Sequence, residues 1–288
     1  DLQCDQSTKE RGPPMSADAK MLHTEKPTRG RRLIGRGLLQ PGPSHLRSMI
    51  RDAKVELIPM KSLERAITEL APHSSISMTC SPAKSIEATL DETAALVAAG
   101  HRVTPHLSAR MVQTPEHLVA IRDRLVEIGI REVFVVGGDA DPPGCFFDAI
   151  EFIEAFLALD DADGPEHRQV DHIGYTSYPD SHPLITSEQL HDALHVKQQM
   201  ILDSGRTAHV STQMCFSADQ IRTWLRGERA AGLTVPVHLG VPGVIDKTKL
   251  MTCLLYTSDA ADDSLRVDLG GRRIIKKVAV SDTLYRCV

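Results

Sequence analysis

Short apolar segments alternate with longer amphipathic segments from Lys54 to Gly243. The clearest apolar segment is Val133–Asp139, which reads VFVVGGD: four apolar residues, three of them β-branched, followed by two glycines and a carboxylate. Such a run is typical of a strand that is buried on both faces of an α/β protein. It places Asp139 at the carboxyl end of the strand, where α/β folds gather their chemistry.

The same alternation predicts seven strands and six helices. The predicted strands span residues 54–59, 75–80, 102–107, 132–138, 171–178, 208–216 and 235–241. The predicted helices lie near residues 61–71, 86–99, 115–129, 146–159, 187–204 and 218–231. Thr114, Pro115 and Glu116 supply a cap, a first-turn proline and an early acid for one of these helices. Gly129 follows its last turn, where a helix commonly ends.

Strict alternation of strand and helix implies parallel strands joined by right-handed crossovers. Seven strands and six helices fit an α/β fold, an incomplete (β/α)8 TIM barrel whose last strand and helix units are missing. A doubly wound open sheet is the alternative. The glycine pattern of dinucleotide-binding folds does not follow the first strand, which argues against a Rossmann domain.

The two ends of the chain differ in pattern from the repeating unit. Residues 1–48 are rich in Pro, Gly, Arg and Ser and show no sustained periodicity, so we expect a disordered or non-native leader. From Cys253 the chain reads CLLYTSDAAD, which resembles a translated transposon-end adapter used in sequencing libraries. We therefore expect a catalytic barrel domain at 49–252, truncated by a non-native tail at 253–288.

Composition excludes several classes of protein. Hydrophobic residues make up 41% and charged residues 25%, as in ordinary globular domains, and no apolar run could span a membrane. A net charge of -5 and 4% aromatic residues argue against a nucleic-acid partner. Six widely spaced cysteines without a C-x-x-C motif suit a reducing compartment, so we expect a cytoplasmic protein.

Polar and titratable residues stand at the ends of the predicted strands, which in a βα barrel line the active site. In strand order these residues include Glu56, Thr79, His106, Asp139, Tyr178, His182 and Gln213. Loop histidines also invite a metal site. We expect none, because the chain has no H-E-x-x-H and no His-x-His spacing.

Four short motifs follow one another at these strand ends. They are Pro105-His106-Leu107, Gly138-Asp139, Tyr178-Pro179-x-x-His182-Pro183, and Thr212-Gln213 with Phe216. Together, over about Val55 to Gly243, they resemble the methylenetetrahydrofolate reductase family. That resemblance implies a flavin-dependent βα barrel of one-carbon metabolism and methionine biosynthesis. It would reduce 5,10-methylenetetrahydrofolate to 5-methyltetrahydrofolate with electrons from NAD(P)H.

The resemblance also implies residue roles. Glu56 would be the general acid, Asp139 would meet the pterin beside the flavin, and Gln213 would contact the folate. The residues matching the family's FAD site are Thr79, His106, Gly138, Asp139, Tyr178, His182, Asp192 and Lys197. The chain departs from the family pattern at Gly137, where relatives carry an arginine. Partners would be the folate substrate and, in a homo-oligomer, further copies of the chain.

Other interpretations remain open at this point. A different folate-binding barrel enzyme, catalysing methyl transfer or lyase chemistry, could use Asp139 as its pterin anchor. A non-catalytic folate-binding barrel could use the same residue. Asp139 could also cap the following helix, and Glu56 could form a structural ion pair.

Overall fold

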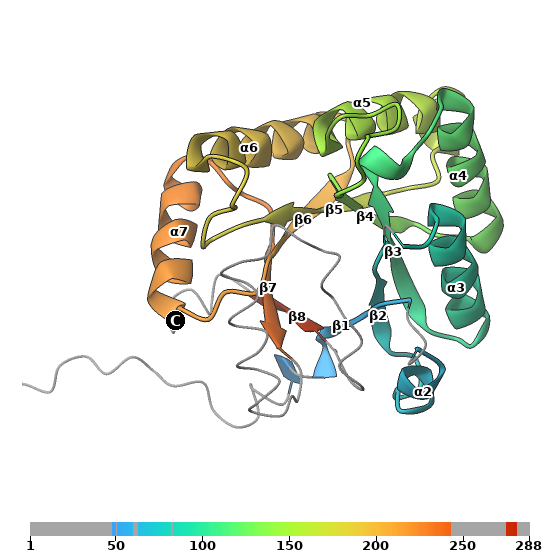
Figure 1. Ribbon diagram of the computed structural model, residues 1–288, viewed down its shortest axis with the longest axis horizontal. Coiled ribbons are helices and arrows are strands. Elements are labelled where there is room, and N and C mark those ends of the chain that lie inside the picture. Colours follow the sequence, from blue (N-terminus) through green and yellow to red (C-terminus); the bar gives the residue numbers. More distant parts are fainter. Residues whose placement is uncertain (1–47, 50, 60–62, 82, 243–274, 281–288) are drawn as a thin grey trace, which may run out of the picture. The chain divides into compact units, whose positions relative to one another are not determined.

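The computed structural model describes residues 48–49, 51–59, 63–81, 83–242 and 275–280, and it alternates strands with helices (Figure 1). The strands are β1 (Lys54–Leu57), β2 (Ser75–Met78), β3 (Arg102–Ser108), β4 (Glu132–Val136), β5 (His172–Ser177), β6 (Thr207–Thr212), β7 (Val237–Pro242) and β8 (Ile275–Val280). The helices are α2 (Leu63–Thr68), α3 (Ile86–Ala98), α4 (Pro115–Ile128), α5 (Ala149–Asp160), α6 (Ser187–Asp203) and α7 (Ala218–Ala230), with short 3-10 turns η1 (Ala109–Met111) and η2 (Pro165–His167).

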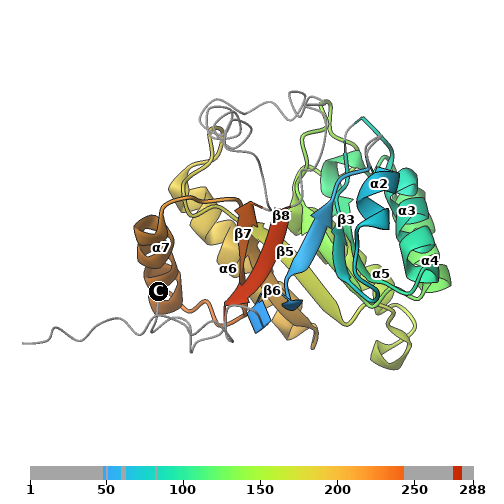
Figure 2. The same cartoon turned by 90° about the horizontal axis from the view of Figure 1, so that it is seen from below.

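Strands β1 to β7 pair in parallel and in chain order, and β8 closes the ring between β7 and β1 (Figure 2). The alternative of an open doubly wound sheet is therefore wrong. Strand β8 runs antiparallel to both neighbours, with Ile275 opposite Glu56 and Lys277 opposite Gly240. The described residues thus hold seven parallel units of a βα barrel and a closing strand of the opposite direction.

The seven parallel strands agree with the predicted incomplete barrel, in which an eighth parallel strand is missing. The sequence did not predict that β8 closes the ring, with its backbone paired to β1 and β7. Strand β8 lies inside the predicted non-native tail, 253–288, whose origin stays a prediction. The predicted leader, 1–48, lies outside the described residues except for Ser48.

Helix boundaries follow the sequence signals closely. The Thr114 side chain accepts from the His117 N–H at the start of α4, and Gly129 ends that helix with φ of 79°. Helix α5 begins at Ala149 and not near 146, because Asp148 caps it by accepting from Ile150 N at 2.7 Å. Strand β6 ends at Thr212, earlier than predicted: the Gln213 N–H still donates to Ser177 O, but the Met214 N–H then donates to the Gln213 side-chain oxygen at 3.0 Å.

The hydrophobic core lies between the barrel and its helices. Val133 and Val135 on β4 are fully buried against an outer layer that includes Phe152 and Phe156 of α5. The alternate residue Phe134 points into the barrel, where its ring meets His106 and His209. The prediction that this strand is buried on both faces is therefore confirmed. None of the helices in the described residues combines the length and apolar character of a membrane span.

The barrel interior is polar, in contrast to its outer wall. Lys54 pairs with Glu132 across the barrel and also donates to Thr104 Oγ1 at 2.7 Å. His172 Nε2 and His209 Nδ1 lie 2.6 Å apart. Burial would raise the pKa of Glu132, but the Lys54 ammonium outweighs it and holds that pKa below its usual value. Parallel pairing stacks these inward residues, because side chains alternate along each strand.

Candidate active site at the strand ends

The structure brings most predicted site residues to the carboxyl ends of the parallel strands. Glu56, Thr79 and His106 are buried there, on or just after β1, β2 and β3. Tyr178 and His182 are half-buried in the segment after β5, whereas Asp139 and Gln213 are exposed after β4 and β6. The seven residues thus come from six successive strands of one ring.

The loop that carries Asp139 is fixed by its neighbours. Gly138 adopts φ of 85°, and a Cβ built there would lie 1.9 Å from Ser108 Oγ. Arg110 binds the loop twice: its N–H donates to Gly137 O at 3.0 Å, and its Nε donates to Ala140 O at 2.8 Å. These contacts hold the backbone on either side of Asp139 and leave its carboxylate exposed. No helix cap is needed from Asp139, because Asp148 caps α5.

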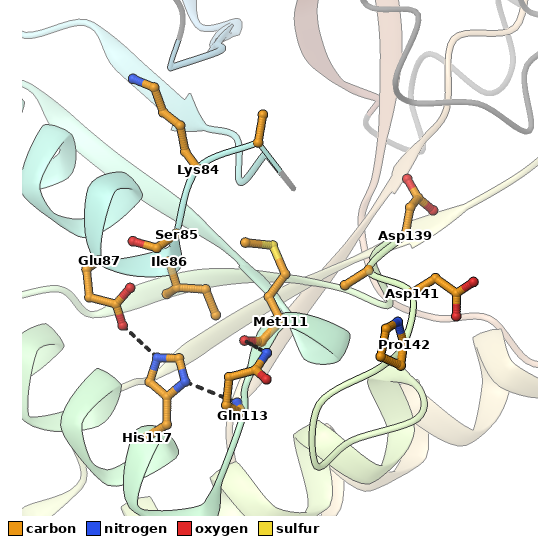
Figure 3. A pocket seen from close by; sticks show the side chains of 12 residues that line it. Lys84, Ser85, Ile86, Glu87, Met111, Gln113, His117, Asp139, Asp141 and Pro142 are labelled. Atoms are coloured by element: carbon orange, nitrogen blue, oxygen red, sulfur yellow. Dashed lines mark hydrogen bonds and ion pairs between the residues drawn. The ribbon is translucent and has the colours of Figure 1, made fainter.

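A pocket of about 740 Å³ opens beside Asp139 (Figure 3). Its lining comes from the start of α3, the turn after β3, the start of α4 and the loop after β4. Figure 3 shows Glu87 and His117 joined on one side of the pocket, and Asp139 and Asp141 on the other. The pocket is wide enough for a heterocyclic ligand.

Sequence reasoning missed the Glu87 and His117 side of the pocket. His117 Nδ1 accepts from Gln113 N at 3.1 Å, so Nε2 carries the proton and donates to Glu87 at 2.6 Å. Hydrogen bonds from Ser85 and then from His117 hold the pKa of Glu87 below its usual value. The cap at Thr114 predicted where α4 begins. Nothing local in the sequence indicated that its first turn faces a cavity.

His106 lies deeper in the barrel than Asp139. Its Nε2 is 2.7 Å from Ser77 Oγ, and its ring lies 4.6 Å from the Phe134 ring. The imidazole is therefore held both by a hydrogen bond and by ring packing. Such a fixed, buried ring suits contact with a planar ligand above it.

Tyr178 and His182 form an edge-to-face ring pair with centroids 5.0 Å apart. Burial lowers the pKa of His182 below its usual value, and the charge of Asp139 partly opposes this shift. His182 and Asp139 therefore interact electrostatically across the strand ends, although they follow different strands. The tyrosine, the histidine and the aspartate lie at one edge of the ring, formed by the carboxyl ends of the strands.

Gln213 is tied to the same edge through its backbone. Its N–H donates to Ser177 O at 2.8 Å, continuing the β5–β6 pairing beyond β6. Its side-chain oxygen accepts from Met214 N at 3.0 Å, which leaves its amide nitrogen group available for a ligand. Within the described residues, the buried hydroxyls of Ser108 and Ser211 have no hydrogen-bond partner. Ser108 is the last residue of β3, and Ser211 is the residue before the last of β6.

Two predicted cofactor residues lie apart from this edge, on α6. Lys197 is buried on the outer side of the barrel, with its Nζ 5.1 Å from the centre of the Tyr175 ring. Burial lowers its pKa to about 8, although Asp148 opposes the shift. Asp192 is exposed on the same helix. A buried lysine of this kind does not present a charge to a phosphate in solvent.

Two groups of three side chains within the described residues have metal-ligand geometry. The first comprises Glu132, His172 and His209 inside the barrel, where the Glu132 carboxylate already forms an ion pair with Lys54. The second comprises His191, His195 and Glu228 on α6 and α7. The sequence signal for the second group was the four-residue spacing of its histidines. The expectation of no metal site rested on other spacings and overlooked it.

No protein-family model matches the chain. Among solved structures it is similar to a protein assigned as a phosphonomutase from Burkholderia cenocepacia J2315. That likeness has 13% identity and a TM-score of 0.44, and covers 74% of this chain and 97% of the other. It is also similar to a xylose isomerase domain protein from Planctomyces limnophilus. Here the identity is 15% and the TM-score 0.33, with 58% of this chain and 64% of the other covered. The fold assignment rests on the strand pairings of this chain alone.

Proposed function

We propose that this chain is an oxidoreductase of one-carbon metabolism that binds a reduced folate at its strand ends. In this proposal it reduces 5,10-methylenetetrahydrofolate with electrons from NAD(P)H. The observation that carries the proposal is the position of Asp139, an exposed carboxylate beside a pocket of about 740 Å³, on a loop whose backbone Arg110 holds on both sides. A carboxylate accepts paired hydrogen bonds from an amino-pyrimidine edge, which is the recognition element of a pterin.

Two further residues support a folate at this edge. Gln213 follows β6, two strands along the ring from Asp139, and its side-chain amide nitrogen can donate to a heterocycle. Glu56 is buried on β1, on the inner side of the ring that carries Asp139. In the proposal, Glu56 donates the proton that opens the methylene bridge, a general-acid role worth about 10²–10⁴-fold in rate.

The residues fit one end of a flavin better than the other. His106, Tyr178 and His182 provide rings and polar atoms at the strand ends, where a planar ring system could be held. The phosphate side has less support, because Lys197 is buried on the outer wall and Gly137 has no side chain. When bound, FAD would supply the hydride chemistry, and the chain would supply position and protons.

The test uses the full chain, with 5,10-methylenetetrahydrofolate, NADH or NADPH, and added FAD. We expect folate-dependent oxidation of the nicotinamide, and flavin absorbance in the protein after gel filtration. Glu56→Gln should lower turnover at least about 100-fold and keep folate binding. Asp139→Asn should weaken folate binding at least about tenfold, because a charged acceptor is lost. Glu166→Gln and Asp163→Asn, in the exposed segment after α5, are the matched controls.

Three other results would each change the assignment. Folate binding without nicotinamide oxidation would favour the methyl-transfer or lyase alternative. The chain could also bind folate without turning over any folate, with a binding affinity that Glu56→Gln leaves unaltered. That result would favour a non-catalytic folate-binding barrel. The absence of folate binding in a folded wild-type chain would overturn the proposal.

A further inference from the structure

Helices α6 and α7 are joined by a cluster of two imidazoles and one carboxylate. Glu228 Oε2 lies 2.8 Å from His191 Nδ1 and 2.9 Å from His195 Nε2. The two imidazole rings are 4.6 Å apart. The Glu228 side chain is 10% exposed, and those of His195 and His191 are 21% and 44% exposed. The carboxylate therefore sits at the base of the cluster and the histidines face outward.

The local sequence explains how the cluster forms. His191 and His195 are four residues apart on α6, so their side chains share one face of that helix. Glu228 is one of the buried residues of α7, in the turn after the buried Leu225. The α6–α7 contact continues at Gln198, whose side chain donates to Gly232 O and accepts from Thr234 N. These contacts fix the two helices at the place where the three ligand-type atoms meet.

The geometry is close to that of a metal site. The three ligand atoms lie within 4.8 Å of one another. A tetrahedral Zn²⁺ with ligand bonds near 2 Å needs ligand atoms roughly 3.3 Å apart. The carboxylate–imidazole distances need to widen by only a few tenths of an ångström to admit the ion. The protons now shared with Glu228 would leave, because metal-bound imidazole and carboxylate must be deprotonated.

We propose that His191, His195 and Glu228 bind a Zn²⁺ ion that fastens α6 to α7. Two imidazoles and one carboxylate match the ligand preference of zinc, whereas Mg²⁺ and Ca²⁺ favour all-oxygen sites. Three protein ligands leave a fourth position for water. The exposure of His191 gives the ion a path from solvent. This site lies on the outer helices and is independent of the folate proposal.

The experiment titrates Zn²⁺ alone into the metal-stripped full chain and follows it by calorimetry. We expect one equivalent to bind with affinity well above that of the His191→Ala/His195→Ala double variant. Glu228→Gln should weaken binding at least about tenfold, since even outer-shell changes at metal sites have effects of that size. His167→Ala is the matched control, because His167 is an exposed histidine beside a glutamate and belongs to neither cluster. It should bind Zn²⁺ as the wild type does.

A second readout separates loss of the site from loss of the fold. Zn²⁺ should raise the melting temperature of the wild type and of His167→Ala, and should raise that of Glu228→Gln less at the same Zn²⁺ concentration, although the glutamine retains a hydrogen-bond acceptor. Replacement by Co²⁺ should give the visible absorption of a nitrogen-ligated tetrahedral ion. The proposal is overturned if the double variant binds Zn²⁺ as tightly as the wild type does. It is equally overturned if His172→Ala alone removes the bound equivalent, which would assign the ion to the barrel interior.

Discussion

Gly138, just after β4, lies directly against Ser108 at the end of the neighbouring strand β3: a Cβ on Gly138 would lie 1.9 Å from Ser108 Oγ. Gly138 also has φ of 85°, a conformation that side chains disfavour. The positive φ and the closeness of Ser108 thus both disfavour a side chain at position 138. Because it has no side chain, Gly138 allows the chain after β4 to pass close to Ser108 at the end of β3. This path determines the position of Asp139.

Replacing Gly138 with alanine should therefore destabilise the protein and displace Asp139. We expect the free energy of unfolding to fall by about 2–4 kcal/mol, from backbone strain plus overpacking. Urea denaturation measures this loss. The matched control is Gly129→Ala, at φ of 79° with nothing within 4 Å, which should lose only about 1 kcal/mol.

A double variant separates the two causes. Ser108→Ala removes the atom at 1.9 Å and leaves the nearest one, Ser108 Cβ, at 3.2 Å. Ser108→Ala/Gly138→Ala should consequently be about as stable as Gly129→Ala. Equal stability of Gly138→Ala and Gly129→Ala would show that crowding by Ser108 has no effect.

The repeating part of this fold was predictable because its signals are local. The cap at Thr114 and the end at Gly129 define a helix within a few residues of themselves, whereas the cap at Asp148 was not recognised and that helix was predicted to begin too early. Strict alternation then indicates parallel strands, and strand ends such as Asp139 follow. The order of these strand ends, read along the chain, is also their order around the ring.

What could not be predicted depends on contacts between distant segments. Strand β8 pairs antiparallel with both β1 and β7, and the alternation of strands and helices, which predicts parallel strands, does not predict this pairing. Glu87 meets His117 only because α3 and α4 pack side by side. Glu228 lies 33 residues from its partner His195, and only the helical spacing of the two histidines was visible in the sequence.

Lys197 should make stability depend on pH. Its pKa in the folded protein is about 8, against 10.5 for an ordinary lysine. The unfolded state therefore binds more protons between these values, so the free energy of unfolding rises as pH increases from 8 to 10.5. In that window, each pH unit changes the free energy of unfolding by about 1.4 kcal/mol. Below the window Lys197 is protonated in both states, so the folded protein carries the full cost of burying the charge.

Urea denaturation at about pH 7 and about pH 9.5 tests this dependence. Lys197→Met should be more stable than the wild type at the lower pH, and the difference should shrink at the higher pH because the wild type gains stability. Lys84→Met, at an exposed position, should leave the wild-type dependence unchanged. A pH-independent difference between Lys197→Met and the wild type would mean that Lys197 is charged in the folded state. That result would restore the phosphate-binding role implied by family resemblance.

Arg206 forms the most deeply buried ion pair among the described residues. Its Nη2 lies 2.9 Å from Asp160 Oδ2, and both side chains are fully buried. Arg206 Nε also donates to Val170 O at 2.8 Å, and Asp160 accepts from Gln169 N and Val170 N. The pair thus connects the end of α5, the start of β5 and the start of β6, at the end of the barrel opposite the candidate active site.

Removing Arg206 would take its guanidinium from the buried Asp160, which keeps Arg122 Nε at 3.6 Å, and from Asp161, which Arg206 binds through two nitrogens. Arg206→Met should therefore lower the free energy of unfolding by about 3–5 kcal/mol in urea denaturation. The control is Arg131→Met, because Arg131 and Asp171 form an ion pair in which both side chains are more than half exposed. That change should cost less than about 1 kcal/mol.

A double-mutant cycle with Asp160→Asn isolates the pairwise part of this effect. Asparagine keeps a side-chain acceptor but carries no charge, so Arg206→Met should cost less in its presence, and the remaining cost would come from the lost pair with Asp161. We expect a coupling free energy above about 1 kcal/mol, as measured for residues that share one hydrogen-bond network. If Arg206→Met cost no more than Arg131→Met, the buried pair would contribute no more than an exposed one. The closure of this end of the barrel would then depend on the surrounding apolar core alone.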